Sequence, residues 1–240
     1  MEAGGGRLES RAGRTALRVV AHLACFVPLA WMAFELAAGR IRGEWIKEIT
    51  HRTGFWGLSF ITLSLAITPL RRSFGWNALQ PYRRVLGLWG FAYIATHFLI
   101  YFLLDKQVPF DPAAAWPEVV KDIAKRPYIT VGFTGFLMLI PLAVTSTKGW
   151  IRRLGKRWTA LHALVYVIGL AGVVHFTWSV KADHTRPTLF GLALITLLGA
   201  RFLPRADLGR HLPFSGVSAG ARTARGWCAA RGWCRPLPSR

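Results

Sequence analysis

The chain has 240 residues, of which 52% are hydrophobic, and a formal net charge of +20. Its mean hydropathy is +0.32, and its uncharged apolar runs are too long for an ordinary soluble domain. The basic residues lie between these apolar runs, which argues against a nucleic acid as the partner of the positive charge.

Six apolar runs are predicted to cross a membrane: residues 19–38, 54–70, 85–104, 128–147, 159–180 and 187–200. The first five are long enough to cross about 30 Å of hydrocarbon at about 1.5 Å per helical residue. The sixth is short and requires Arg201 to extend toward the lipid head groups. We therefore expect an all-α, polytopic membrane bundle of six transmembrane helices.

The first apolar run has a second interpretation as a secretory signal, because basic residues precede it and small residues follow it. The run is longer than a signal core and five more follow, which favours an uncleaved span. We divide the chain into an N-terminal segment (1–14), a transmembrane domain (15–203) and a basic tail (204–240). The tail is rich in Gly, Arg, Pro and Ser and is expected to be disordered.

The distribution of lysine and arginine predicts the orientation. The N-terminal segment, the second and fourth loops and the tail lie on one side and contain 21 of the 31 basic residues. By the positive-inside rule this side is cytoplasmic, so both termini are expected in the cytoplasm. The basic loops would then face anionic lipid or an anionic cofactor.

Three histidines lie within the apolar runs: His97, His162 and His175. An ionisable side chain in hydrocarbon usually has a partner or a function, and two imidazoles can ligate a haem iron. His97 lies about 20 Å and His175 about 25 Å from the cytoplasmic ends of their helices. Because these depths are similar, we expect the two to be the axial ligands of one haem.

A second histidine level is predicted nearer the cytoplasm, where His162 and His22 each lie about 6 Å deep. His22 is the weaker candidate for a haem ligand. His162 and His175 are about 140° out of phase on an ideal helix, so either they face different partners or the helix is distorted. Gly169 and Gly172 are the candidate positions for such a distortion.

Small residues accompany the first pair. Gly90 precedes His97 by two turns, and Ala171 and Gly172 precede His175 by one. They could leave room for a porphyrin, or they could allow close helix packing. His97 and His175 could also be packing residues, or a proton relay in a haem-free transporter. A quinone-linked cytochrome b that anchors another dehydrogenase is a further alternative.

Several motifs resemble the MsrQ (YedZ) family, which belongs to the ferric-reductase-like transmembrane group. They are Arg-Arg-Val-Leu-Gly-Leu-Trp (83–89) before His97, Thr-Ser-Thr (145–147) and Leu-Gly-Lys-Arg-Trp (154–158) before His162, and Trp-Ser-Val-Lys (178–181) after His175. The resemblance covers roughly residues 15–203. Members are haem-binding membrane subunits of a bacterial periplasmic system that reduces methionine sulfoxide in proteins.

The resemblance implies a b-type cytochrome in the bacterial inner membrane, acting as the electron-transfer subunit beside a separate catalytic subunit. Electrons would pass from the quinone pool or a cytoplasmic flavin reductase to a periplasmic molybdopterin enzyme. His97, His162 and His175 match the histidines implicated in haem binding. Members are also described as binding FMN, for which we would look to the basic second and fourth loops.

Overall fold

The computed structural model describes residues 5–41, 43–108 and 110–200, all within one compact unit, residues 1–205. Every regular element of these residues is helical, as the apolar runs predicted. The tail, residues 204–240, lies outside the described residues. The first helix begins at Gly5, so residues 5–14 of the N-terminal segment are its first turns.

In chain order the helices are α1 (Gly5–Ala37), α2 (Trp45–Phe74), the short η1 (Asn77–Leu79), α3 (Tyr82–Ile100), the π-helical turn η2 (Tyr101–Asp105), α4 (Pro112–Lys125), α5 (Pro127–Val144), α6 (Lys148–Leu154), α7 (Lys156–His162), α8 (Leu164–Ser179) and α9 (Thr185–Gly199).

Five helical stretches are long and apolar enough to span a bilayer: Thr15–Ala37, Trp45–Phe74, Asn77–Asp105, Pro127–Val144 and Lys156–Ser179. They correspond to the first five predicted spans. Helix α9 covers the region of the sixth predicted span, but its 15 residues would extend only about 22 Å. The membrane helix bundle is confirmed, and the sixth span stays a prediction.

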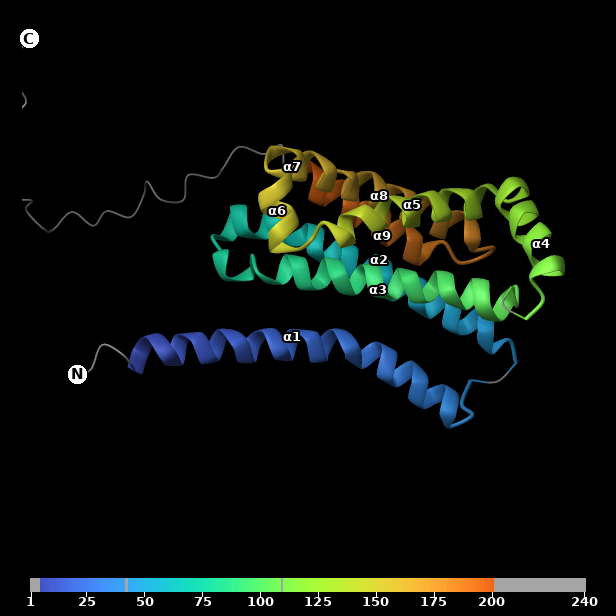
Figure 1. Cartoon of the computed structure of the whole chain (residues 1–240), viewed down its shortest axis with the longest axis horizontal. Helices are drawn as coiled ribbons and strands as arrows, with labels where there is room; N and C mark the ends of the chain where they lie inside the picture. Colours follow the sequence, from blue (N-terminus) through green and yellow to red (C-terminus); the bar gives the residue numbers. More distant parts are fainter. Residues whose placement is uncertain (1–4, 42, 109, 201–240) are drawn as a thin grey trace, which may run out of the picture. The chain divides into compact units, whose positions relative to one another are not determined.

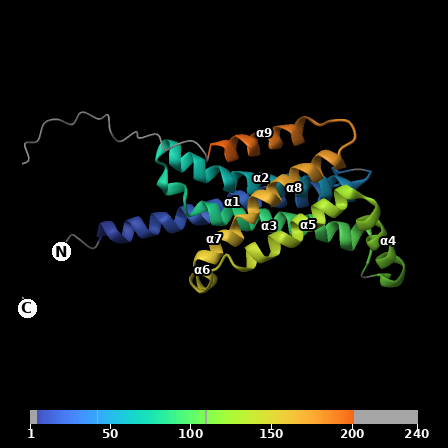
Figure 2. The same ribbon diagram turned by 90° about the horizontal axis from the view of Figure 1, so that it is seen from above.

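Helix α2 packs against α3 and also contacts α8 and α9 (Figures 1 and 2). Two glycines permit the close contact with α3. A Cβ on Gly57 would lie 2.5 Å from Cγ1 of Ile94, and a Cβ on Gly90 would lie 2.8 Å from Cγ1 of Ile61. Small residues let membrane helices approach closely enough for extensive van der Waals contact. A second helix pair is formed by α5 and α8.

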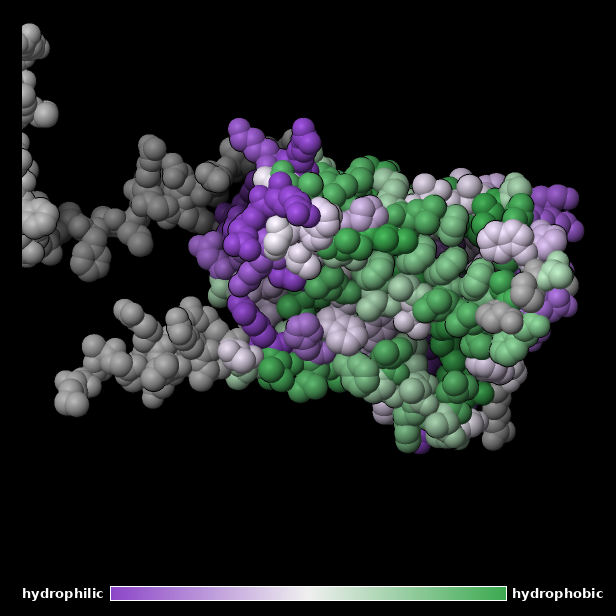
Figure 3. All heavy atoms as spheres, viewed as in Figure 1, coloured by the Kyte–Doolittle hydropathy of each residue, from purple (hydrophilic) through white to green (hydrophobic). Residues whose placement is uncertain are grey.

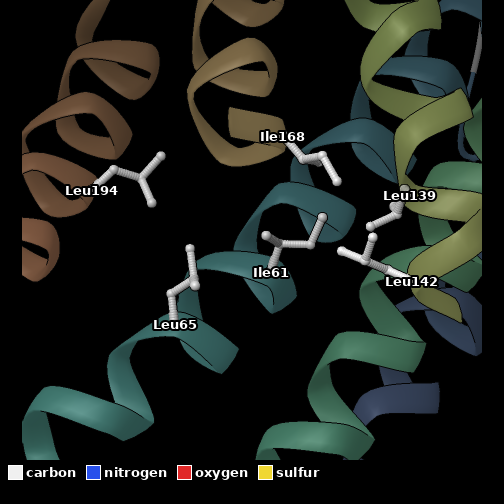
Figure 4. Packing of buried hydrophobic residues seen from close by; sticks show 6 residues of the cluster. All are labelled: Ile61, Leu65, Leu139, Leu142, Ile168 and Leu194. Atoms are coloured by element: carbon white, nitrogen blue, oxygen red, sulfur yellow. The ribbon is translucent and has the colours of Figure 1, made fainter. Parts of the chain in front are cut away.

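An aliphatic core joins the two helix pairs and α9 (Figure 4). No more than 5% of any of its six side chains is exposed. The residues are Ile61, Leu65, Leu139, Leu142, Ile168 and Leu194. Because lipid is as apolar as these side chains, their close packing rather than their transfer from water stabilises the arrangement.

Helix α1 is attached to α2 and α3 by polar contacts beside a small buried cluster. The hydroxyl of Tyr93 donates a hydrogen bond to the carbonyl oxygen of Cys25 at 3.0 Å. Arg52 pairs with Glu35 near the other end of the contact. Such bonds hold a helix in hydrocarbon because no water competes for the groups. They explain how α1 stays attached although many of its apolar side chains are exposed.

The two ends of the bundle differ in charge. One end, which we call the basic end, carries residues 71–84 and 148–157, with nine lysines and arginines. Residues 53–104 and 127–182 contain no Asp or Glu, so the described acidic side chains gather at the opposite end. Figure 3 shows hydrophilic residues over the α6 and α7 end beside a hydrophobic middle. This pattern fits a protein whose middle lies in a membrane.

Helix α4 is held at the opposite end by a buried carboxylate. Asp122 is 8% exposed. It lies 2.8 Å from Nζ of Lys106 and 3.2 Å from Nε of Arg126, and it accepts a hydrogen bond from the hydroxyl of Tyr101 at 3.3 Å. Burial raises the pKa of Asp122, but the interactions with Lys106 and Arg126 outweigh this effect and leave the pKa below its ordinary value. The ionised carboxylate therefore connects α4 to the end of α3.

We expect Asp122→Asn to destabilise the protein by about 2 kcal/mol at neutral pH, because Lys106 loses its charged partner. A lowered pKa in the folded state means that the carboxylate contributes fully above its unfolded pKa of about 3.9. This contribution is lost as the pH falls through the lower folded pKa. The melting temperature of the variant should therefore be lower than that of the wild type at pH 7. The two should be equal at a pH below the folded pKa of Asp122.

The matched control is Glu118→Gln, since the Glu118 side chain is exposed on the same helix. It should leave the melting temperature unchanged at both pH values. An equal loss of stability in the two variants would contradict a specific role for Asp122.

Candidate functional site

His97 on α3 is held by the beginning of α2. Its Nδ1 lies 2.8 Å from the carbonyl oxygen of Thr50. A carbonyl can only accept a hydrogen bond, so Nδ1 carries the proton and Nε2 keeps a free lone pair. One turn along α2, Gly54 lies against the imidazole: a Cβ at this position would lie 3.0 Å from Nδ1. The ring is thus fixed in position and tautomer.

His175 on α8 is held in the same way by the beginning of α5. Its Nδ1 lies 2.7 Å from the carbonyl oxygen of Tyr128, which again assigns the proton to Nδ1. A Cβ on Gly132, one turn along α5, would lie only 2.5 Å from Nδ1. Metal-binding histidines typically donate their second N–H to a carbonyl in this manner.

The two imidazoles face each other. Their ring centroids are 6.0 Å apart and their planes are at 88°. Two metal–nitrogen bonds of about 2 Å each, plus about 1 Å from each nitrogen to its ring centre, require about 6 Å between centroids. The residues present therefore fit a haem iron with two axial histidines. The predicted pairing of His97 with His175 is thus supported by their geometry.

The α2–α3 and α5–α8 pairs hold their histidines by the same arrangement of carbonyl, glycine and imidazole. Sequence reasoning missed this internal repeat. Each histidine follows its carbonyl partner by 47 residues. The signal in the sequence is a repeat of Gly-Phe-X-Gly at 54–57 and 132–135, and of His-Phe at 97–98 and 175–176. It is easily overlooked because the residues between these motifs differ.

The small residues expected to make room for a porphyrin have another role. Gly90 packs against Ile61, and a Cβ on Gly172 would lie 3.0 Å from Cδ1 of Leu58. The space beside both glycines is therefore filled by side chains of α2. The expectation that they leave room for a porphyrin is wrong, and close helix packing explains them.

His162 lies apart from the facing pair, at the end of α7. Its Nδ1 is 3.2 Å from the carbonyl oxygen of Trp158, and its ring stacks on the Trp158 indole at 3.9 Å between centroids. Its Nε2 is buried without a hydrogen-bond partner. Between α7 and α8 the helical hydrogen-bond pattern changes at Ala163, which keeps helical backbone angles, and not at the suggested Gly169 or Gly172. His162 thus presents a free, buried nitrogen near the basic end.

His22 differs from the other three. Its Nδ1 accepts a hydrogen bond from the indole N–H of Trp89 at 3.0 Å. In the neutral imidazole the proton is then on Nε2, which leaves that nitrogen without a lone pair for a metal. This contact favours a role for His22 in attaching α1 to α3.

His51 lies at the beginning of α2, next to Thr50, and is exposed. It helps to line an open, polar pocket of about 440 Å³ together with Glu35, Arg40, Ile41, Glu44, Lys47, Glu48 and Arg52. His51 therefore lies at the end of the bundle opposite the basic end.

Comparison with known proteins adds independent information. Residues 53–173 match the family model described as ferric reductase like transmembrane component. The chain is 41% identical over 201 residues to a Xanthomonas campestris pv. campestris protein, covering 81% of this chain and 89% of the relative. It is 45% identical over 177 residues to a Caulobacter vibrioides protein, covering 73% and 81%. Both relatives are named "Protein-methionine-sulfoxide reductase heme-binding subunit MsrQ".

The matched region contains His97, His162, Gly54 and Gly132, and it ends two residues before His175. The longer alignments with the named relatives cover most of the chain. The chain therefore belongs to the MsrQ family of ferric-reductase-like transmembrane proteins.

Proposed function

We propose that this chain is the haem-binding, electron-transferring membrane subunit of a protein-methionine-sulfoxide reductase. The observation that carries the proposal is the facing pair of His97 and His175, in which Nδ1 donates to a carbonyl and Nε2 is free. The names of the relatives support it. The catalytic work would belong to a separate subunit.

His97 and His175 would be the axial ligands of one haem b. The bound haem supplies one-electron transfer. With both histidines holding the haem, the site would favour electron transfer over oxygen chemistry. The carbonyls of Thr50 and Tyr128 accept the Nδ1 protons and thereby orient both imidazoles with Nε2 available for binding.

His162 would serve nearer the electron donor, either as a ligand of a second haem or at the point where electrons enter. Its buried, unpartnered Nε2 supports this role. We further propose FMN as a cofactor on the basis of the family resemblance, near residues 71–84 and 148–157. The electron donor would be the quinone pool or a cytoplasmic flavin reductase.

The proposed location is the bacterial inner membrane, with the basic end and both termini in the cytoplasm. The concentration of lysine and arginine at that end supports this orientation. His97 and His175 would then lie toward the periplasm. A molybdopterin-containing reductase subunit would dock there and receive the electrons.

The orientation predicts the behaviour of reporter fusions. A C-terminal alkaline phosphatase fusion should be inactive and a C-terminal GFP fusion fluorescent, because the fusion point is cytoplasmic. A phosphatase fused after Val108, in the loop before α4, should be active. The reverse pattern would contradict the orientation and move the docking site to the basic end.

Electron delivery tests the function directly. The reduced full chain should be reoxidised by a purified periplasmic methionine sulfoxide reductase subunit only when an oxidised methionine peptide is present. Reoxidation by a different dehydrogenase alone would favour a general cytochrome b anchor. A protein that carries no haem would favour the proton-coupled transporter.

A further inference from the structure

Helix α4 has one buried face and a large exposed surface. The buried face carries Ala115, Val119 and Asp122, and no more than 8% of any of these residues is exposed. Ala115 and Val119 pack in a small apolar cluster with Val108 and Phe102, which belong to the preceding segment. This face is the one by which α4 is attached to the bundle, so its other residues are available to the surroundings.

The exposed residues of α4 separate into an apolar face and a polar face. At about 100° per residue, the exposed apolar residues fall on one stripe of the helix, about 100° wide. This apolar face consists of Ala113, Trp116, Pro117, Val120 and Ala124, and the polar face beside it carries Glu118, Lys121 and Lys125. Trp116 is 56% and Val120 51% exposed. A helix normally turns such a stripe toward an apolar partner, so the exposed stripe marks a contact surface.

Helix α4 lies across the end of the bundle opposite the basic end, crosswise to the long helices (Figures 1 and 2). If these helices span a membrane, α4 runs along its surface. Trp45, the first residue of α2, and Trp178, in the last turn of α8, are exposed at the same end. Tryptophan is enriched where hydrocarbon meets the lipid head groups. Trp116 of α4 therefore lies at the end where this boundary is expected.

Exposed apolar side chains also follow the chain from the third span to α4. Leu99 and Leu104, near the end of the span, are 47% and 38% exposed, and Phe110, shortly before α4, is 80% exposed. Lipid is the natural surrounding of the side chains on the span. The apolar face of α4 continues this lipid-facing surface along the chain, which favours lipid over a protein as its partner.

We propose that the apolar face of α4 lies in the phospholipid surface of the membrane, with the polar face toward the head groups and water. A helix with one apolar and one charged exposed face matches this boundary. Asp122, which pairs with Lys106 at 2.8 Å, then ties the surface-lying helix to the end of the span that carries His97. The proposal depends neither on haem nor on electron transfer.

Spin labels on the purified full chain in phospholipid nanodiscs test the proposal. The three native cysteines are replaced by alanine, and one labelled cysteine is introduced at a time. The sites on the apolar face are Ala113→Cys, Val120→Cys and Ala124→Cys, and the controls on the polar face are Glu118→Cys, Lys121→Cys and Lys125→Cys. All six positions are exposed, so a label fits at each of them without displacing the bundle.

The labels are relaxed by oxygen, which concentrates in lipid, and by a nickel chelate, which stays in water. Labels on the apolar face should be relaxed mainly by oxygen, at a depth of about 5 to 10 Å below the lipid surface. The control labels should be relaxed mainly by the nickel chelate. The ratio of the two effects should therefore vary along α4 with the period of the helix.

The fluorescence of Trp116 provides a second measurement that needs no label. The component of the emission that Trp116→Phe removes should be quenched by phospholipids brominated near the head group, and not by iodide in the water. Equal relaxation of both faces by the nickel chelate would overturn the proposal. So would quenching of the Trp116 component by iodide alone, because the apolar face would then lie in water and be left to a protein partner.

Discussion

Alanine in place of His97 or His175 is expected to remove the low-spin haem or convert it to a five-coordinate, high-spin form. Each variant deletes one of two imidazoles whose ring centroids are 6.0 Å apart. The rate of electron delivery to the reductase subunit should fall at least about a hundredfold. Loss of a residue that only supports a metal ligand already costs about 10- to 100-fold, and loss of the ligand itself should cost more. Absorption and EPR spectra of the full chain in membranes measure the effect.

His162→Ala should act differently and leave the haem between His97 and His175 largely intact. His184→Ala is the control, because His184 lies at the same end of the bundle as the pair and is exposed. Added imidazole should restore the low-spin spectrum of the His175 variant by filling the vacated position. If both pair variants kept a full low-spin spectrum and His162→Ala lost it, the ligands would have to be sought near His162 and His22.

Gly132→Ala is expected to reduce the content of low-spin haem nearly as much, although it replaces neither of the two histidines. The added Cβ would lie 2.5 Å from Nδ1, 2.8 Å from Cε1 and 2.9 Å from Cγ of His175. Contacts this short cannot be accommodated by a ring that is also bonded to the Tyr128 carbonyl, so the imidazole must move. We expect loss of most low-spin haem, measured by the absorption spectrum.

Gly54→Ala should have a smaller effect of the same kind, because its Cβ would lie 3.0 Å from Nδ1 of His97. A small displacement of that ring would shift the midpoint potential while keeping the haem. Gly149→Ala is the control, since its nearest neighbouring atom would lie 3.9 Å away. Normal haem content and potential in Gly132→Ala would show that the glycine does not position His175.

The sequence was sufficient to predict the helical bundle, because the length of each uncharged run can be counted. Depth along each helix was sufficient to select His97 and His175, whose ring centroids lie 6.0 Å apart. The sequence was not sufficient to find Gly54 and Gly132. Their importance depends on which turn of α2 faces α3 and which turn of α5 faces α8, and this register is set by tertiary packing. Counting residues toward a histidine along its own helix found Gly90 instead, which packs against α2.

His162 and His175 illustrate the same limit. Their phase difference indicated that one straight helix could not present both to one partner. The glycines were the natural places for a distortion, yet the hydrogen-bond pattern of the helix changes at Ala163 and not at either glycine. His162 is instead held by Trp158, whose indole N–H donates to the carbonyl oxygen of Thr145 at 3.0 Å. A contact between segments decided the position, and a helical wheel does not contain such contacts.

His22 shows why the hydrogen-bond partner matters more than depth. His22 and His162 have similar predicted depths, but a donor faces Nδ1 of His22 and an acceptor faces Nδ1 of His162. The two contacts select opposite tautomers. Only the second tautomer leaves Nε2 available for a metal.

A reduced-minus-oxidised absorption spectrum of the purified full chain tests the central claim most directly. The account predicts the bands of a low-spin, bis-histidine haem b, either as purified or after reconstitution with haem. A colourless protein that takes up no haem on reconstitution would contradict it.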